Sequence, residues 1–256
     1  MLLNLLQSGL SAGFDSMDFK LSLVYILLSL PIIMFALSAH ETAHGLVANW
    51  MGDPTAKNLG RLTLNPFKHL NPIGFLSMLI VGFGWANPVP INTRNFKNPR
   101  VGMAISGIAG PISNFLIAFV SLFLSMLLQF ILILSGVEQP HILIEVLDMF
   151  LFMSTYLNLA LAVFNLIPVP PFDGSRIFYA FLPPKWYFGV MKYERYIMLG
   201  CIILFFALNR LNVNPLGAFE DWVINGLFTV TGMGAGTEEL GVLNLLFAYL
   251  SNLMQL

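Results

Sequence analysis

The sequence predicts an all-α polytopic membrane protein with about four to six transmembrane helices, a re-entrant segment and a short β-element near the cytoplasmic face. Apolar residues make up 57% of the 256 positions and charged residues only 10%, whereas soluble domains carry about 25% charge. Several uncharged runs approach or exceed the roughly 20 residues that a helix needs to cross a bilayer. Ten of the twelve Lys and Arg residues fall in two segments, 51–100 and 173–195.

The first predicted span runs from about Leu21 to Trp50, and residues 21–39 contain no charge. Pro31 should kink this helix, which a membrane protein tolerates because neighbouring groups satisfy the freed backbone atoms. A Gly-Asp-Pro turn at 52–54 ends the span. The strand-like run from Arg61 to Leu64 that follows is the short β-element of the predicted fold.

The next apolar stretch, Ile73 to Phe83, is too short to cross a bilayer. Basic residues lie on both sides of it, at Lys68 before and at Arg94 after. Because positively charged segments stay in the cytoplasm, this element should return to the side from which it came. We expect a re-entrant helix, followed by extended chain from Pro88 to Asn92.

Three further apolar segments are expected to form helices. Residues Val101 to Val137 carry no charge and predict one long or broken helix. An acidic linker at 138–148 precedes the next span, Met149 to Phe172, and a short span, Tyr196 to Leu208, follows. All of these elements belong to a single membrane domain of residues 1–256.

The distribution of positive charge predicts the orientation of these spans. The positive-inside rule places 51–100 and 173–195 in the cytoplasm. The N-terminus, the 138–148 linker and residues 211–221 then lie outside. Three full passes bring the end of the first span and the end of the Met149–Phe172 span to the same side of the membrane. No role can be assigned to residues 211–256.

Residues 40–44 read His-Glu-Thr-Ala-His and directly follow the first uncharged run. Two imidazoles and a carboxylate at the end of a membrane span are costly to bury, so they indicate a functional site. On a helix, His40 and His44 lie one turn apart and face the same way, so they can hold one zinc ion. Glu41 lies beside them and can take a proton from a water molecule that the metal activates. The alternative is two inert, hydrogen-bonded histidines near a helix end.

A catalytic zinc needs a third protein ligand, and Asp173 is the best candidate. It follows an apolar span, inside a Pro-rich turn, on the same side of the membrane as His44. Without a partner, an Asp within a membrane costs about 2.5 to 3.5 kcal/mol, which a zinc ion would offset. Pro-x-x-Asp-Gly is also ordinary turn chemistry, and that alternative stays open.

Other polar residues in apolar segments are weaker candidates. Asn114 and Asn165 can each donate a hydrogen bond to a substrate carbonyl or a developing oxyanion, or simply join two helices. Asn158 is a weaker candidate of the same kind. His69 and His141 have no partner at ligand spacing, and we expect His69 to be a solvated loop residue.

Three motifs resemble those of the site-2 proteases, which are zinc metalloproteases that cleave peptide bonds within the membrane. They are the His-Glu-Thr-Ala-His run, the Gly-Pro-Ile-Ser-Asn run that ends at Asn114, and the run from Asn165 to Gly174. The segments that begin at Gly60 and Phe83 look like the compact bacterial subgroup, which lacks PDZ and CBS domains. The resemblance covers roughly residues 20 to 200.

This resemblance implies an intramembrane zinc metalloprotease with one zinc per chain, acting on a peptide bond in or near a transmembrane segment of a membrane-protein substrate. It implies the bacterial plasma membrane as the location, with the site towards the cytoplasmic face. It also implies that Asn114 and Asn165 hold substrate backbone, that Glu41 is the base, and that the zinc ligands are His40, His44 and Asp173.

A non-hydrolytic zinc-binding membrane protein is the competing class, either a metal transporter or an inactive scaffold. A transporter would need polar groups across the membrane depth, whereas the candidates here cluster at one face. An inactive scaffold would have lost Glu41 or a ligand. No basic patch interleaved with aromatic residues suggests nucleic acid. The expected partners are a membrane-protein substrate and the lipid bilayer, and the sequence leaves the oligomeric state open.

Overall fold

The computed structural model describes residues 17–81, 85–137, 141–170 and 172–183, together with isolated positions between 193 and 207. The predicted fourth span, Tyr196 to Leu208, lies largely outside the described residues. Residues 211–256 lie wholly outside them.

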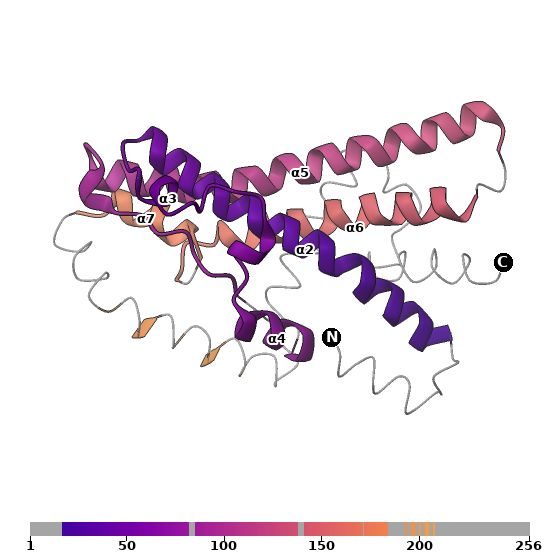
Figure 1. Ribbon diagram of the computed structural model, residues 1–256, viewed down its shortest axis with the longest axis horizontal. Helices are drawn as coiled ribbons and strands as arrows, with labels where there is room; N and C mark the ends of the chain where they lie inside the picture. The colour runs from indigo at the N-terminus through magenta and orange to yellow at the C-terminus, as the bar shows by residue number, and fades with distance from the viewer. Residues whose placement is uncertain are drawn as a thin grey trace.

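Three long apolar helices form the body of the described structure. They are α2 (Met17–Trp50), α5 (Pro99–Ser135) and α6 (Ile142–Asn165). Each is long and apolar enough to cross a membrane, which confirms the predicted all-α polytopic fold. Figure 1 shows α5 and α6 lying side by side and α2 crossing them. Pro31 and Pro111 lie inside α2 and α5 without ending them.

The helices meet through two small clusters of buried apolar side chains. One joins Ile32 of α2 to Met149 and Met153 of α6. The other joins α5 to α6 through Ala118, Leu159 and Val163. Most other apolar side chains of α5 are exposed, as expected for a helix that faces lipid.

The boundaries predicted for the third pass are wrong at both ends. The helix begins at Ile142, not Met149, because the His141 side chain caps it by accepting from the Leu143 N–H at 3.2 Å. Asp148 is tolerated inside the helix because Ser125 and Gln129 of α5 donate to its carboxylate. The helix ends at Asn165, because Pro168 and Pro170 lack the N–H that a helix needs and disfavour helical backbone before them.

The short helix α4 (Pro72–Val81) occupies the stretch that is predicted to be a re-entrant element. Leu70 and Ala86, which flank it, pair in an isolated antiparallel bridge. The chain therefore returns to the place from which it left, as expected for a segment too short to cross. Figure 1 shows α4 set apart from α5 and α6.

The predicted strand from Arg61 to Leu64 is not formed, and in the described part of the chain the Leu70–Ala86 bridge is the only β-pairing. The N–H groups of Arg61 and Thr63 donate to the carbonyls of Ala56 and Arg61, and side chains take the place of a neighbouring strand at the Thr63 carbonyl. The Thr63 carbonyl accepts from Thr42 Oγ1 at 2.7 Å and contacts His69 Nε2 at 2.8 Å. His69 is only 1% exposed, so the expectation that it is solvated is also wrong.

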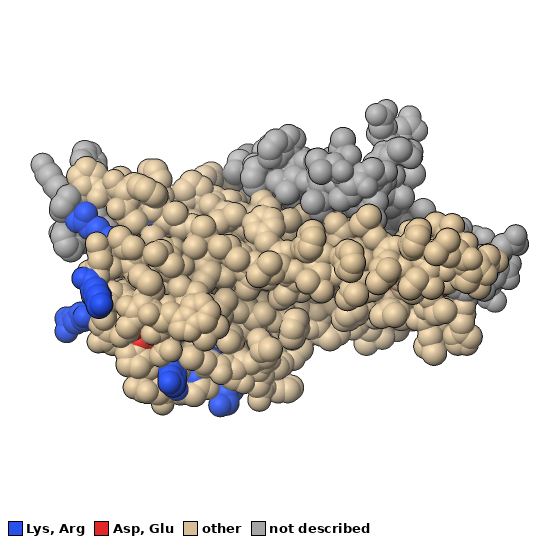
Figure 2. All heavy atoms as spheres, turned by 90° about the horizontal axis from the view of Figure 1, so that it is seen from above, with Lys and Arg blue, Asp and Glu red and all other residues tan. Residues whose placement is uncertain are grey.

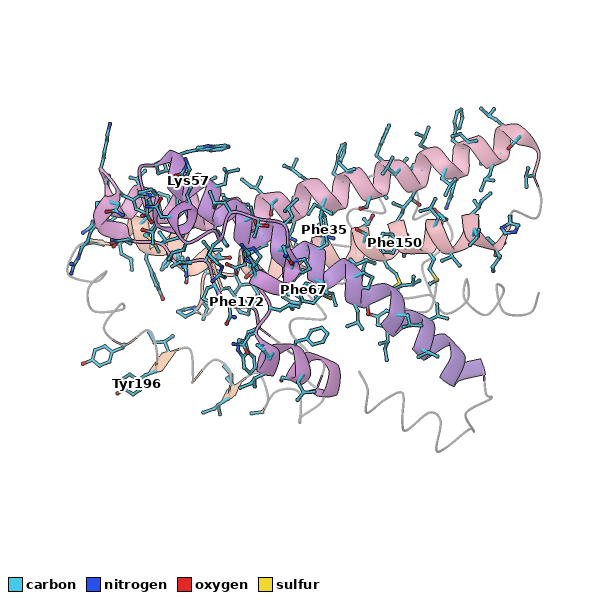
Figure 3. The ribbon with its side chains drawn as sticks, in the orientation of Figure 1. Phe35, Lys57, Phe67, Phe150, Phe172 and Tyr196 are labelled. Atoms are coloured by element: carbon cyan, nitrogen blue, oxygen red, sulfur yellow. The ribbon has the colours of Figure 1, made fainter. Side chains whose placement is uncertain are left out.

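Among the described residues, positive charge gathers at one end of the structure. Figure 2 shows the visible Lys and Arg side chains at the end where α3 (Thr55–Asn58) and α7 (Gly174–Phe181) lie, and a long surface without charge beyond them. The short helices η1 (Pro66–Lys68) and η2 (Thr93–Asn95) carry basic residues too. Figure 3 shows Lys57 at this end, away from Phe35 and Phe150.

Candidate metal centre

Two histidines of α2 and the aspartate that precedes α7 meet at one point. The Nε2 atoms of His40 and His44 are 3.0 Å apart, and Oδ2 of Asp173 is 2.9 Å from the first and 3.0 Å from the second. The three residues are between 4% and 9% exposed. The structure thus brings the three predicted ligands together. They meet because the end of α2 and the Pro-rich turn that follows α6 lie at the same end of the described structure.

The outer nitrogen of each ring has a partner that fixes the ring. Nδ1 of His44 lies 2.6 Å from the Ser106 carbonyl oxygen, which can only accept, so this nitrogen carries the hydrogen. Nδ1 of His40 lies 2.6 Å from Oδ1 of Asn114. The amide nitrogen of Asn114 donates to Asn158 Oδ1 at 3.0 Å, which turns its oxygen towards His40.

These contacts leave three electron-rich atoms facing one another. In a neutral ring whose Nδ1 carries the hydrogen, Nε2 presents a lone pair. Two such lone pairs and a carboxylate oxygen repel one another unless a cation lies between them. Residues that hold the outer nitrogen of a ligating histidine are the usual second layer of a metal site.

The size of the site also fits a zinc ion. A Cβ atom at Gly110 of α5 would lie 2.5 Å from His44 Nε2 and 2.6 Å from His40 Nε2, so glycine keeps the space in front of both rings free. A tetrahedral zinc with bonds of about 2.0 Å separates its ligand atoms by roughly 3.3 Å, close to the separations seen here. Two histidines and one carboxylate form a known catalytic zinc set with an open fourth position.

Glu41 follows His40 on α2 and is half-buried. Its Oε2 accepts a hydrogen bond from the Val89 N–H at 2.7 Å. Val89 belongs to the non-helical chain between Pro88 and Asn92, the segment predicted to be extended. The candidate base therefore lies between the metal centre and this chain.

The two candidate amides differ in their surroundings. Asn114 is fully buried, and its side chain is engaged by His40, Asn158 and the Ala36 carbonyl. It therefore both joins α5 to α6 and holds a candidate ligand. Asn165 is half-buried at the end of α6 and donates to the Leu161 carbonyl of its own helix at 2.9 Å.

Sequence reasoning missed two residues of this site. Ser106 acts through its backbone carbonyl, which leaves no signal in the residue type. Gly110 stands out as part of a Gly-Pro pair within α5, but such a glycine predicts close helix approach as readily as free space beside a metal.

The comparisons with known proteins agree with this geometry. The model of "Peptidase family M50" matches residues 131–208, which include Asn165 and Asp173. The chain is 41% identical over 204 residues to "Putative zinc metalloprotease YwhC" of Bacillus subtilis (strain 168), a match that covers 80% of this chain and 87% of that protein. It is 29% identical over 197 residues to "Zinc metalloprotease MJ0392" of Methanocaldococcus jannaschii, over 75% of this chain and 44% of that protein. No solved structure gives a significant match. The chain belongs to peptidase family M50, the family of the site-2 proteases.

Proposed function

We propose that this protein, an intramembrane zinc metalloprotease of peptidase family M50, hydrolyses a peptide bond in or near a transmembrane segment of a membrane-protein substrate. One observation carries the proposal. Three buried atoms that can each donate a lone pair to a metal converge within 3.0 Å of one another. They lie near the end of a helix long and apolar enough to span a membrane, and Glu41, which follows His40 on that helix, adds a carboxylate.

The roles of the residues follow from this arrangement. His40, His44 and Asp173 would hold one zinc ion per chain, which when bound polarises a carbonyl group and acidifies water. Glu41 takes the proton of the attacking water and then delivers a proton to the leaving amine. One of its carboxylate oxygens is occupied by Val89, so the other faces the reaction.

The substrate must reach the site with its backbone exposed. The carbonyls of a transmembrane helix are hydrogen-bonded within the helix, so the cleaved segment must unwind locally. The chain from Pro88 to Asn92 is a plausible edge for an unwound substrate to add as a strand. Pro88 and Pro90 have no N–H, and the Val89 N–H donates to Glu41. The first backbone N–H from Pro88 onwards that remains for a substrate is therefore that of Ile91.

The two amides have different proposed roles. Asn165, at the end of α6, steadies the substrate backbone or the developing oxyanion. Asn114 instead orients His40, since its side chain is already engaged within the protein.

The protein is an integral membrane protein, and we place it in a bacterial plasma membrane with the metal centre towards the cytoplasm. The support is the charge distribution. The visible basic side chains gather at the end that carries the metal centre (Figures 1 and 2), and positive charge marks the cytoplasmic side.

Cleavage of membrane-spanning peptides by the purified protein tests this function. The protein in detergent is incubated with a panel of transmembrane peptides, beside a Glu41→Gln variant of equal zinc content. We expect the wild type to cleave at least one peptide and the variant to cleave none, because the amide cannot act as a base. Equal cleavage by both proteins would remove Glu41 from the mechanism, and a metal-replete wild type that cleaves none of the peptides would contradict the proposed activity.

A further inference from the structure

The carboxylate of Glu41 is held by a backbone group. Its Oε2 accepts from the Val89 N–H at 2.7 Å, and among the described residues Oε1 makes no hydrogen bond. A carboxylate on a side chain with several rotatable bonds, held by one hydrogen bond in the described structure, depends on that bond for its orientation. The position of the candidate base is therefore set by a segment far from it in the sequence.

This segment is stiff because of its sequence. Pro88 and Pro90 enclose Val89, and each proline has its φ angle fixed by its ring. A residue that precedes a proline is restricted to extended backbone, which applies to Val89 itself. Since neither proline has an N–H, Val89 is the only one of the three residues that can donate to Glu41.

The segment is anchored before Val89 by contacts around Asn87. The Asn87 N–H donates to the His69 carbonyl at 2.7 Å, and its side-chain amide contacts Asn71 and the Leu70 carbonyl. Arg61 donates to the Asn87 carbonyl at 2.8 Å. These four partners come from the chain that precedes α4, so both sides of the re-entrant element take part.

The segment is anchored after Val89 by Asp53, which is fully buried just beyond the end of α2. One carboxylate oxygen accepts from the Asn92 N–H at 2.6 Å. The other accepts from the Asn95 side chain at 2.7 Å. Asp53 thus ties the far end of the segment to the helix that carries Glu41.

The Val89 side chain packs directly against α2. It is 7% exposed, and a Cβ atom at Gly45 would lie 2.9 Å from its Cγ1. Gly45 follows Glu41 by four residues and so lies on the same face of α2. Glycine at this position lets the segment lie close enough to α2 for its N–H to reach the carboxylate.

We propose that the Val89 N–H is the positioning group of the catalytic base, and that Asp53 is a positioning residue that holds Val89 in place. This inference rests on the proposed role of Glu41 as the base. The two anchors and the Gly45 contact fix the segment, the segment fixes one oxygen of Glu41, and the other oxygen is left directed at the water. Displacement of a reacting group by about 1 Å can lower a rate about a hundredfold.

A matched pair of variants separates the N–H from the side chain. Val89→Pro removes the N–H and keeps an extended backbone, whereas Val89→Ala removes part of the side chain and keeps the N–H. Both are compared with wild type and with Glu41→Gln, on a transmembrane peptide that the wild type cleaves. We expect Val89→Pro to lower kcat about tenfold to a hundredfold, with KM and zinc content within about threefold of wild type. Val89→Ala should lower kcat by a clearly smaller factor than Val89→Pro, because it keeps the N–H and loses only part of the side chain that packs against Gly45.

The outcomes separate this inference from the proposed function. A Val89→Pro protein with wild-type kcat, beside an inactive Glu41→Gln protein, would overturn the inference and leave the base in place. An active Glu41→Gln protein would instead overturn the proposed role of Glu41. Equal losses in Val89→Pro and Val89→Ala would assign the effect to packing and also overturn the inference.

Two further variants decide the matter if Val89→Pro does not fold or loses zinc. Replacement of Val89 by its α-hydroxy acid exchanges the N–H for an ester oxygen without changing the side chain, and it should lower kcat in the same way. Asp53→Asn loosens the far anchor and should lower kcat by a smaller factor at unchanged KM and zinc content. Wild-type kcat in both proteins would overturn the inference.

Discussion

The contact between Asn114 and His40 decides which nitrogen of His40 faces the metal centre. Asn158 accepts from the Asn114 amide nitrogen at 3.0 Å, so the Asn114 oxygen must face the ring. The ring then donates through Nδ1 and keeps the lone pair of Nε2 free for a metal. A buried polar chain of this kind is sensitive to the loss of one member, because the remaining groups are left without partners.

Asn114→Ala should therefore weaken zinc binding. Loss of a group that orients a metal ligand typically costs about 10-fold to 100-fold in metal affinity. A competition titration against a chelator measures this affinity. Asn165→Ala serves as the control because, among the described residues, the Asn165 side chain donates only to a carbonyl of its own helix. Unchanged zinc affinity in Asn114→Ala would show that His40 does not need this partner.

Asn165→Ala should lower turnover and leave zinc content unchanged. Removal of one donor to a developing oxyanion costs about 10² to 10³ in rate. A purely structural role would instead lower stability, by about 0.6 kcal/mol for an average hydrogen bond in a membrane protein. Activity and melting temperature, measured together on the metal-replete protein, distinguish the two. Near-normal turnover would leave Asn165 with a structural role only.

At the scale of residues, the sequence predicts ligand types better than their supporting contacts. His40 and His44 follow from the spacing of the motif, because residues four apart share a helix face. The contact of Asn114 with His40 cannot be predicted from the sequence in this way, since it depends on how α2 packs against α5. His69 is an exposed loop residue by sequence position, yet its ring is buried against the Thr63 carbonyl.

At the scale of elements, Asp53 joins the end of α2 to η2 through partly buried hydrogen bonds. Burial alone would raise the pKa of Asp53, but hydrogen bonds from Thr55, Asn95 and the Asn92 N–H outweigh it and lower the pKa below its ordinary value of 3.8. The ionised form is therefore favoured by folding. Asp53 lies beyond the last residue of the membrane-spanning helix.

This lowered pKa predicts how stability depends on pH. The contribution of Asp53 is fully present above its ordinary pKa of 3.8 and is lost as the pH falls below that value through the lowered pKa of the folded protein. The melting temperature of the wild type in detergent should thus exceed that of Asp53→Asn near neutral pH, and the difference should shrink in strong acid. A difference that stays constant on acidification would mean that Asp53 is not the stabilising carboxylate.

The elements that the sequence mispredicts are those whose polar groups are satisfied from a distance. Asp148 predicts a linker, because a carboxylate seldom lies in an apolar helix, and only the packing of α5 supplies its donors. The run from Arg61 to Leu64 has strand-like alternation, but its Thr63 carbonyl bonds to side chains from α2 and the following loop. By contrast, α4 is predicted well, because its length and flanking charges are local properties.

At the scale of the whole molecule, three helices carry the chain from one end of the described structure to the other and back. This odd number of passes is what brings Asp173 to the end of α2 that carries His40 and His44. The distribution of Lys and Arg along the sequence already predicts that the end of α2 and the end of α6 lie on the same side of the membrane. It does so because that distribution can be read without knowing how the helices pack. Residues 211–256 carry no motif, and neither composition nor spacing assigns them a role.

The orientation of these passes can be measured in intact cells. Single cysteines at Asn58, Asn98 and Lys185, in a Cys201→Ser background, should resist a membrane-impermeant thiol reagent, because all three positions lie in basic segments that we propose to be cytoplasmic. Permeabilised cells provide the control in which all three should react. Labelling of all three in intact cells would invert the orientation.

Metal analysis of single variants tests the proposed zinc centre most directly. We predict about one zinc per chain in the wild type and in Glu41→Gln, because the proposed role of Glu41 is that of a base and not of a ligand. Zinc content should fall strongly in His40→Ala, His44→Ala and Asp173→Ala, since each substitution removes one of the three proposed protein ligands. Full zinc occupancy in a folded Asp173→Ala protein would contradict the three-ligand centre and return Asp173 to the role of an ordinary turn residue.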